Sequence, residues 1–255
     1  MNNVIILEGM PRGFLSTYTT ILLTFRELIG RRGIDPSIVK IAPMMFSRYG
    51  SPSNWFDKDF IATSLNGKHY GSTEFVDIDP WPTIEQLNLL WYTQFLPYSD
   101  RLKNYLKTNL LELENCLGIH YRGTDHVWHT DRVTLDVFFE SLKKEFESKQ
   151  YDQVFICTDE ENIIEQFEKF LKDRYNFTNV VRNNTIKSST KTSLHYTNFD
   201  PVTKMKLGDQ VLLDSHSISK CKSVICKTSN IINYARILNL NLIPIYQDKD
   251  SDFRG

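Results

Sequence analysis

The chain has 255 residues, of which 41% are hydrophobic and 24% charged, a composition typical of a globular protein. Its formal net charge of -1 excludes a general electrostatic attraction to nucleic acid or to an anionic membrane. No apolar run approaches the roughly 20 residues of a membrane-spanning helix, and the first residues lack a basic secretory leader. We therefore expect a cytoplasmic protein without a transmembrane segment and without a nucleic-acid partner.

The elements expected along the chain are those of an α/β fold with parallel strands, because short β-branched runs alternate with segments of helical period. Strands are expected at 4–8, 38–42, 75–79, 117–121, 154–158, 179–181, 223–227 and 242–246. Helices are expected near 99–115 and over 135–146, 163–171 and 231–238. The polar, aperiodic segment 182–209 predicts a long loop, which is typical of a lid, a binding loop or disorder.

The helix near 99–115 ends in a polar turn, and the alternation of strands and helices restarts after it. This pattern favours two α/β halves with a cleft between them, residues 1–112 and residues 113–255. The cysteines lie mostly in apolar stretches and lack the paired spacing of a zinc site, which predicts buried free thiols in a reducing compartment. They are Cys116, Cys157, Cys221 and Cys226.

Polar side chains follow several of the expected strands, at the end where ligands bind in open α/β sheets. His120 and Arg122 lie at the end of one strand, and Thr228 and Ser229 lie between a later strand and a helix. A helix N-terminus with two hydroxyls suits an anion, although the same residues are also ordinary helix caps. This helix N-terminus and the guanidinium of Arg122 could together hold a diphosphate. They would then stabilise a leaving pyrophosphate, as glycosyl transfer from a nucleotide sugar requires.

Three blocks of the sequence resemble GDP-fucose-dependent fucosyltransferases, in particular the α1,6 and protein O-fucosyl groups. "HYRGTDH" (120–126) is similar to their H-x-R-x-T/S-D motif, and "VFICTDEEN" (154–162) is similar to their strand ending in T-D. The segment 212–238 resembles their C-terminal block, in which L-D-x-H precedes a strand, a Ser/Thr pair and a helix. The blocks occur in the family's order, and "EGMPRGF" (8–14) matches its glycine-containing turn after the first strand.

The resemblance implies a GT-B fold, in which two Rossmann-like domains face each other across a cleft. It implies that residues 1–112 form the acceptor side and residues 113–255 the nucleotide-sugar donor side. The reaction implied is inverting and needs no metal, with GDP-fucose as the donor substrate and a glycan or protein as the acceptor.

The resemblance also implies roles for individual residues. Arg122 would bind the β-phosphate and help the leaving group depart, while Thr228 and Ser229 would bind phosphate. His120 and Asp214 would contact the nucleobase side of the donor. The remaining donor-binding residues implied are Gly9, Arg12, Gly13 and His216.

The sequence departs from the family around the first block. The α1,6 enzymes have a second arginine where this chain has Gly123, and a lysine where it has His126. Asp125 would organise the loop. The glutamate proposed as the base in some members has no clean counterpart, which leaves Asp131, His126 and His129 as candidate general bases.

Structural interpretations of the same residues stay open. His120 inside an apolar strand is compatible with a core histidine, and Arg122 with Asp125 is compatible with an ion pair across a turn. His126 and His129 would suit zinc only on a helix, and their segment favours a loop, so we expect no metal. The chain also has a D-x-D pattern at 77–79. The same pattern occurs twice elsewhere as "DKD", so it arises easily in this sequence, and we interpret the residues at 77–79 as polar residues at the end of a strand.

Three other functions fit parts of the sequence. A relative that uses another nucleotide sugar, such as a UDP-sugar, would keep the same phosphate site. The segment 9–22 resembles the phosphosulfate-binding loop of sulfotransferases, although Gly13-Phe14-Leu15 interrupts its core. Because the base is not identified, a non-catalytic protein that binds nucleotides or glycans is the third alternative.

Overall fold

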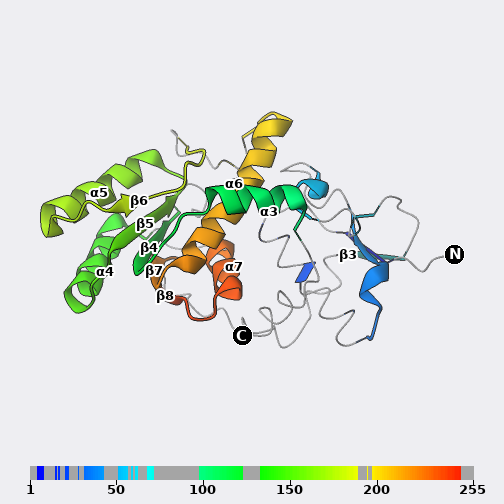
Figure 1. Cartoon of the computed structure of the whole chain (residues 1–255), viewed down its shortest axis with the longest axis horizontal. Helices are drawn as coiled ribbons and strands as arrows, with labels where there is room; N and C mark the ends of the chain where they lie inside the picture. Colours follow the sequence, from blue (N-terminus) through cyan, green and yellow to red (C-terminus); the bar gives the residue numbers. More distant parts are fainter. Residues whose placement is uncertain are drawn as a thin grey trace. The chain divides into compact units, whose positions relative to one another are not determined.

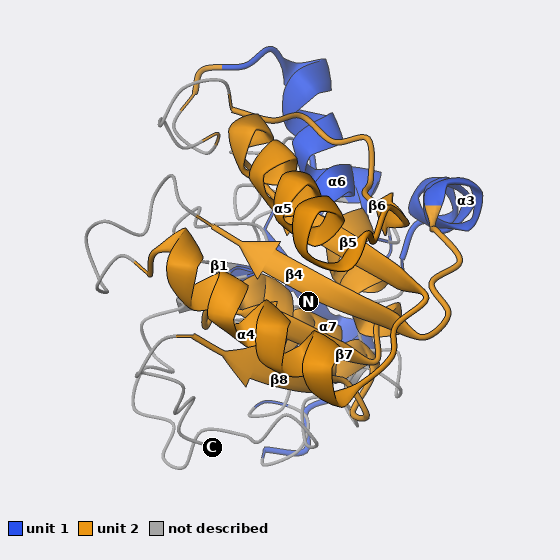
Figure 2. Ribbon diagram, turned by 90° about the vertical axis from the view of Figure 1, so that its left-hand side faces the viewer, with its two compact units in different colours: residues 1–109, 199–212, 254–255 blue, residues 110–198, 213–253 orange. Residues whose placement is uncertain are grey.

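The computed structural model of the chain describes residues 5–8, 15, 17, 21–22, 28, 32–42, 51–56, 59, 61–62, 68–71, 98–122, 133–188, 194 and 197–247. It divides into unit 1 (residues 1–109, 199–212 and 254–255) and unit 2 (residues 110–198 and 213–253), shown in Figure 2. Each unit contains a parallel β-sheet, and helices alternate with strands along the chain (Figure 1). The α/β class expected from the sequence is therefore confirmed.

The sheet of unit 1 has three parallel strands in the order β2-β1-β3. β1 (Ile5–Glu8) lies between β2 (Val39–Ile41) and β3 (Lys68–Gly71). The first three residues of β1 are buried, as expected of a central parallel strand, which reads as an unbroken apolar run. β3 carries no such signal, because its sequence Lys-His-Tyr-Gly has no β-branched residue. The strand expected at 75–79 lies outside the described residues.

Three helical elements of unit 1 have both ends within the described residues and precede helix α6 (Pro201–Lys220): the 3-10 turns η2 (Pro36–Ile38) and η4 (Pro52–Asn54), and the helix α3 (Asp100–Asn109). Helix α6 belongs to unit 1 up to residue 212 and to unit 2 from residue 213.

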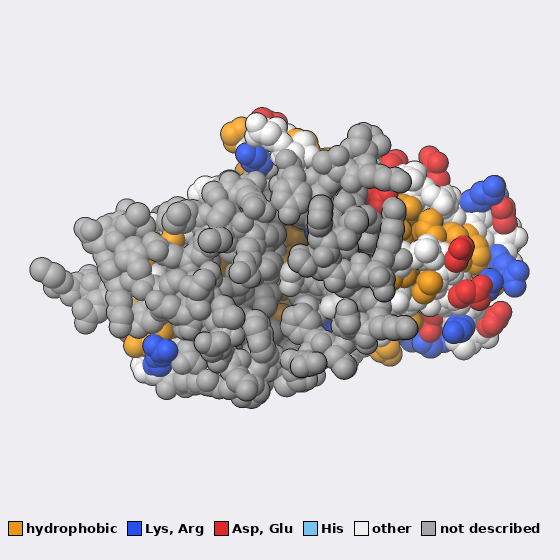
Figure 3. Space-filling view, turned by 180° about the vertical axis from the view of Figure 1, so that it is seen from behind, with side chains coloured by type: hydrophobic (Ala, Val, Ile, Leu, Met, Phe, Trp, Pro, Cys, Tyr) orange, Lys and Arg blue, Asp and Glu red, His pale blue; other side chains and the backbone are white. Residues whose placement is uncertain are grey.

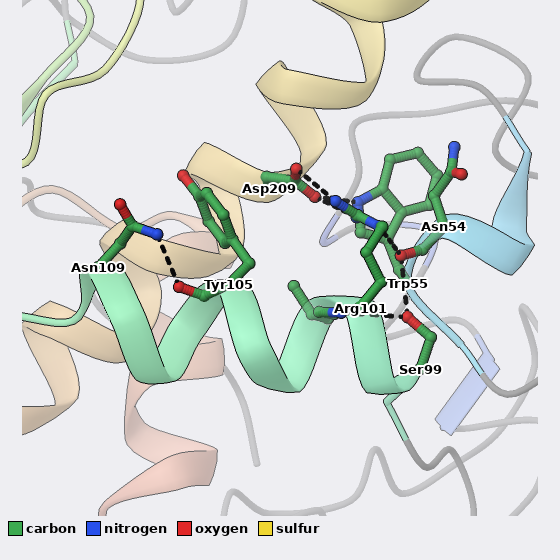
Figure 4. Close-up of polar contacts among 8 residues, drawn as sticks. Asn54, Trp55, Ser99, Arg101, Tyr105, Asn109 and Asp209 are labelled. Carbon is green, nitrogen blue, oxygen red and sulfur yellow. Dashed lines mark hydrogen bonds and ion pairs between the residues drawn. The ribbon is translucent and has the colours of Figure 1, made fainter.

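A buried carboxylate joins α6 to α3 within unit 1 (Figure 4). The side chain of Asp209, 5% exposed, accepts hydrogen bonds from Nη1 and Nη2 of Arg101 at 2.9 and 2.6 Å. It also accepts one from the indole Nε1 of the fully buried Trp55 at 3.0 Å. Gly208 packs so closely that a Cβ there would lie 2.5 Å from the indole ring. The indole, the guanidinium and α6 are therefore fixed against one another.

The sheet of unit 2 has five parallel strands in the order β6-β5-β4-β7-β8. They are β4 (Cys116–Tyr121), β5 (Gln153–Thr158), β6 (Val180–Val181), β7 (Ser223–Cys226) and β8 (Ile243–Tyr246). From β4 the chain adds β5 and β6 on one side, and it then adds β7 and β8 on the other side. This doubly wound order places a topological switch point between β4 and β7.

Helices cover both faces of this sheet. α4 (Leu135–Ser148) and α5 (Glu161–Tyr175) lie on one face, and α7 (Asn230–Leu238) lies on the other (Figure 2). Alternate residues of β4 enter the two cores, as the period of a strand requires. The core beneath α4 and α5 includes Leu117, Ile119, Tyr121, Phe138, Leu142, Ile164 and Phe167. The core beneath α6 and α7 includes Cys116, Phe155, Cys157, Ile218, Val224, Ile232 and Ala235.

The predictions for the buried strands and for three helices of unit 2 are confirmed, and all four cysteines are free and buried. The helix expected near 99–115 is wrong at its C-terminal end, because α3 already ends at Asn109. Leu113 continues the helical spacing of leucines, yet it is buried outside any helix, in the core beneath α6 and α7. The spacing of leucines alone does not distinguish a leucine buried on a helix from one buried in an irregular segment.

The long loop expected over 182–209 is wrong for its last nine residues, because α6 begins at Pro201. Oδ1 of Asp200 accepts hydrogen bonds from the backbone N–H groups of Val202 and Thr203 at 2.9 and 3.1 Å and caps the helix. Proline at the first helical position is already in helical conformation. The start signal was thus present, but apolar and polar residues are mixed along α6, so its periodicity is weak.

The outer surface of unit 2 around α4 and α5 carries acidic and basic side chains side by side (Figure 3). On α4, Lys143 pairs with Glu140 and Lys149 pairs with Glu145, one helical turn apart. Such neighbouring charges of opposite sign screen one another, so this surface attracts neither anions nor cations strongly.

We predict that Asp209→Ala destabilises unit 1, because it leaves a buried indole N–H and a guanidinium without their acceptor. The free energy of unfolding should fall by about 2 to 4 kcal/mol, measured by urea denaturation. Glu140→Ala, which removes a surface partner of Lys143, is the control and should leave the unfolding midpoint unchanged. Equal stability of the two variants would contradict a structural role for Asp209.

Candidate functional site

The carboxyl ends of β4 and β7 meet at the switch point of the unit 2 sheet. The register pairs Leu117 with Ser223 and His120 with Cys226. Arg122 and Thr228 each follow two residues after the second pair. The two polar residues therefore lie at the same position along the strand direction. Ligands of doubly wound sheets bind in the crevice beyond such strand ends. The structure therefore brings His120, Arg122 and Thr228 to one edge of one sheet, and their roles in binding stay predictions.

The N-terminus of α7 lies at this switch point and suits an anion. Ser229 has an extended backbone (φ -159°, ψ 157°), and its Oγ accepts a hydrogen bond from the N–H of Ile232 at 3.3 Å. The interpretation of Ser229 as a helix cap is thus confirmed, and its hydroxyl proton can still be donated to a ligand. Lys227, 3% exposed, immediately precedes Thr228. The first N–H groups of the helix and its dipole add positive potential at the same point.

His120 is buried on the α6–α7 side of β4, 2% exposed. The side of the sheet follows from alternation, because Cys116 belongs to the core beneath α6 and α7. A Cβ added at Gly118, on the same side, would lie 3.1 Å from Cγ2 of Val224 and 3.2 Å from Sγ of Cys221. A glycine two residues before His120 thus lets β4 and β7 pack closely where the site begins.

Asp214, on the unit 2 part of α6, is surrounded by polar partners at the end of β5. Its Oδ1 accepts a hydrogen bond from Nδ2 of Asn183 at 2.8 Å, and Asn183 also donates to Oγ of Ser217 at 3.1 Å. Burial raises the pKa of Asp214, against the opposing effects of the Lys187 charge and the Asn183 hydrogen bond. The same burial, with the neighbouring Asp214 carboxylate, raises the pKa of the Cys157 thiol well above its ordinary value.

The polar segment after β6 is held against the end of β5. Nζ of Lys187 donates to the carbonyl oxygen of Thr158 at 2.6 Å and to Oγ1 of Thr185 at 2.5 Å. The N–H of Ser188 donates to the carbonyl oxygen of Asp159 at 2.7 Å. The T-D pair of β5 thus anchors this segment, and the segment supplies Asn183 and Lys187 to Asp214. Neither residue has a sequence signal, because each meets its partner only through the fold.

His216, predicted to bind the donor, is on α6, and its ring contacts α7. Its ring meets that of Tyr234 edge to face, with centroids 6.3 Å apart. Burial, with a smaller effect of the Lys220 charge, lowers the pKa of His216 from 6.5 to about 4. The imidazole is therefore neutral at pH 7, and it packs as an aromatic ring.

The remaining predicted site residues lie outside the described part of the chain. They are the loop residues Asp125, His126, His129 and Asp131 and the first-strand turn residues Gly9, Arg12 and Gly13. Within the described ranges, no three His, Cys, Asp or Glu side chains are grouped so that they could hold a metal ion. No helix in these ranges has the length and hydrophobicity to cross a bilayer.

We predict that His216 makes stability fall in mild acid. Between pH 6.5 and about 4 the unfolded chain binds a proton at this residue and the folded protein does not, so protonation favours unfolding. At pH 5 the loss attributable to His216 is about 2 kcal/mol. His216→Phe, which keeps an aromatic ring, should remove that part of the pH dependence in urea denaturation at pH 7.5 and pH 5. An unchanged difference between the two pH values would contradict the neutral, buried imidazole.

Comparison with known proteins gives no sequence match: no protein-family model and no curated protein matches the chain. Solved structures do resemble it. The α1,6-fucosyltransferase NodZ soaked with GDP-fucose has a TM-score of 0.57 at 12% identity, over 93% of this chain and 93% of that chain. NodZ from Bradyrhizobium gives 0.57 at 12% identity over 94% of both chains. POFUT1 in complex with GDP-fucose gives 0.50 at 11% identity, over 96% of this chain and 98% of that chain.

At such low identity, structural likeness establishes a fold and leaves the activity to be tested. The similarity spans nearly the whole length of both partners in each comparison, so it covers both units of the chain. This chain therefore has the α/β fold of the GT-B fucosyltransferases, as the sequence resemblance implied.

Proposed function

We propose that this chain is an inverting, metal-independent glycosyltransferase that transfers L-fucose from GDP-fucose to a hydroxyl of a glycan or protein. The proposal is supported by the pairing of β4 with β7, because β4 ends just before Arg122 and β7 ends just before the N-terminus of α7. NodZ, which shares this fold, has been crystallised with GDP and soaked with GDP-fucose. A cationic strand end beside a helix N-terminus is the chemistry that such a diphosphate needs.

The proposed role of this site is to stabilise the departing diphosphate. As the bond between the sugar and the diphosphate breaks, negative charge grows on the phosphate oxygens. Arg122 would bind the β-phosphate, and Thr228, Ser229 and the N–H groups of α7 would bind phosphate oxygens. These donors are held by the sheet and the helix before the reaction, so they need little reorganisation in the transition state.

The nucleobase is proposed to lie on the side of Asp214 and His120, with His216 packed behind them. A carboxylate accepts hydrogen bonds, and guanine presents a ring N–H and an amino group side by side on one edge. Uracil presents a single N–H between two carbonyl groups on the corresponding edge. Asp214, positioned by Asn183, therefore favours a guanine nucleotide over a uracil nucleotide.

The acceptor hydroxyl is proposed to reach the sugar from the loop after β4. Asp131, His126 or His129 would take its proton as the general base, and Asp125 would organise the loop. Gly9, Arg12 and Gly13 are proposed as further donor-binding residues. In this proposal residues 1–112 form the acceptor side and residues 113–255 the donor side. A cytoplasmic location would keep the four buried thiols reduced.

We predict that Arg122→Ala lowers the rate of fucose transfer from GDP-fucose by about 10² to 10³-fold, because it removes one preorganised donor to the leaving group. Release of GDP, measured with a panel of glycan acceptors, follows the reaction. A chelator should leave the wild-type rate unchanged. Arg174→Ala, on the exposed surface of α5, is the matched control and should keep the wild-type rate.

Full activity of the Arg122→Ala variant, with a wild-type melting temperature, would overturn the proposed role of the switch point. Replacing the donor separates the alternatives. Turnover of a UDP-sugar in place of GDP-fucose would keep the site and change the nucleotide. Sulfate transfer from phosphoadenosine phosphosulfate would indicate a sulfotransferase. Tight GDP binding without transfer or donor hydrolysis would indicate a binding protein.

A further inference from the structure

The carboxamide of Asn233 is a buried polar group in the first turns of α7. The residue is 3% exposed, and no residue in the described part of the chain hydrogen bonds to its Oδ1 or its Nδ2. An amide that loses water without gaining a partner opposes folding. Native proteins keep few such groups, and each one calls for a specific explanation, such as a ligand that completes it.

Helix geometry places Asn233 close to the switch point. The backbone N–H of Asn233 donates to the carbonyl oxygen of Ser229 at 3.0 Å, so Asn233 lies one turn after the helix cap. Residues four apart share a helix face, and side chains lean toward the N-terminus. Ile232 and Ala235 enter the apolar core, whereas Asn233 lies on the side of α7 away from both. Asn233 therefore shares a face of α7 with Ser229, one turn from the end of the helix that suits an anion.

The chemistry of the amide selects the kind of ligand group. Nδ2 offers two N–H donors and Oδ1 is an acceptor. A phosphate oxygen would satisfy the donors only and would leave Oδ1 without a partner. Two adjacent hydroxyls satisfy both atoms, because a hydroxyl donates and accepts. Sugars with adjacent hydroxyls adjoin the diphosphate of a sugar nucleotide on both sides, the ribose on one and the hexose on the other.

We infer that Asn233 is a further donor-binding residue, whose carboxamide binds adjacent hydroxyls of a sugar next to the diphosphate held by α7. This inference rests on the proposed function, since it assigns a contact within the same site. The amide is retained although it is unfavourable in the chain alone, and it is satisfied when the sugar nucleotide binds.

The test is Asn233→Leu, which keeps the size and branching of the side chain and removes its polar atoms. Without ligand, the melting temperature should rise by about 2 to 4 °C, because a buried amide without partners is gone. The dissociation constants of GDP and of GDP-fucose are then measured by calorimetry. A loss of about tenfold for both ligands assigns the contact to the ribose, and a loss for GDP-fucose alone assigns it to the hexose.

Tyr175→Phe is the matched control. Its hydroxyl, at the end of α5, is likewise buried without a hydrogen-bond partner among the described residues. Removing it should raise or keep the melting temperature and leave both dissociation constants within about twofold of wild type. A similar loss of affinity in this control would overturn the inference, because the effect would not be specific to Asn233.

Unchanged affinities in a folded Asn233→Leu protein would also overturn the inference and would leave the proposed function intact. If Asn233→Leu does not fold, Asn233→Ala is measured in its place with the same expected losses of affinity. If the wild-type protein binds neither GDP nor GDP-fucose, the proposed function fails and this inference fails with it. The two failures are therefore distinguishable by the wild-type titration.

Discussion

The pairing of β4 with β7 is the interaction on which the candidate site depends. These strands are neighbours in space although about a hundred residues separate them, and their pairing creates the switch point of the sheet. Gly118 permits the close packing of this pair, since a side chain there would press on Val224 and Cys221. The register then sets the height at which Arg122 and Thr228 leave their strands. A displaced register would move Arg122 away from the level of Thr228, and the proposed diphosphate site requires both residues at one level.

The strands of unit 2 could be predicted because a parallel sheet covered on both faces demands unbroken apolar runs. "VFICT" and "SVICK" have no other plausible place than a buried strand, and the structure puts β5 and β7 there. Two elements, α6 and β3, were not predicted, because their sequences lack a clear pattern. α6 combines apolar and polar residues without a clear stripe, and β3 (Lys-His-Tyr-Gly) has no β-branched residue and only one residue, Tyr70, that strands favour. Their conformations come from tertiary packing, which overrides local preference.

The residues of the candidate site could be predicted only where they lie next to the end of a strand or the start of a helix in the sequence. His120 and Arg122 end one strand and Ser229 begins one helix, so residue type and position together identified them. The polar residues around Asp214 were not predictable, because Asn183 reaches it from 31 positions earlier in the chain. Buried polar groups at this edge are unfavourable for stability: burial raises the pKa of Asp214, and the amide of Asn233 has no partner among the described residues. Functional sites often retain such groups, because the ligand completes them.

The most direct test of the central claim is a crystal structure of the chain with GDP. The account predicts the diphosphate at the N-terminus of α7, beside Arg122, Thr228 and Ser229, with the guanine directed toward Asp214. The first N–H groups of α7 should lie within hydrogen-bonding distance of phosphate oxygens, at about 2.7 to 3.2 Å. GDP bound at another place on the chain, with the carboxyl ends of β4 and β7 unused, would contradict the account.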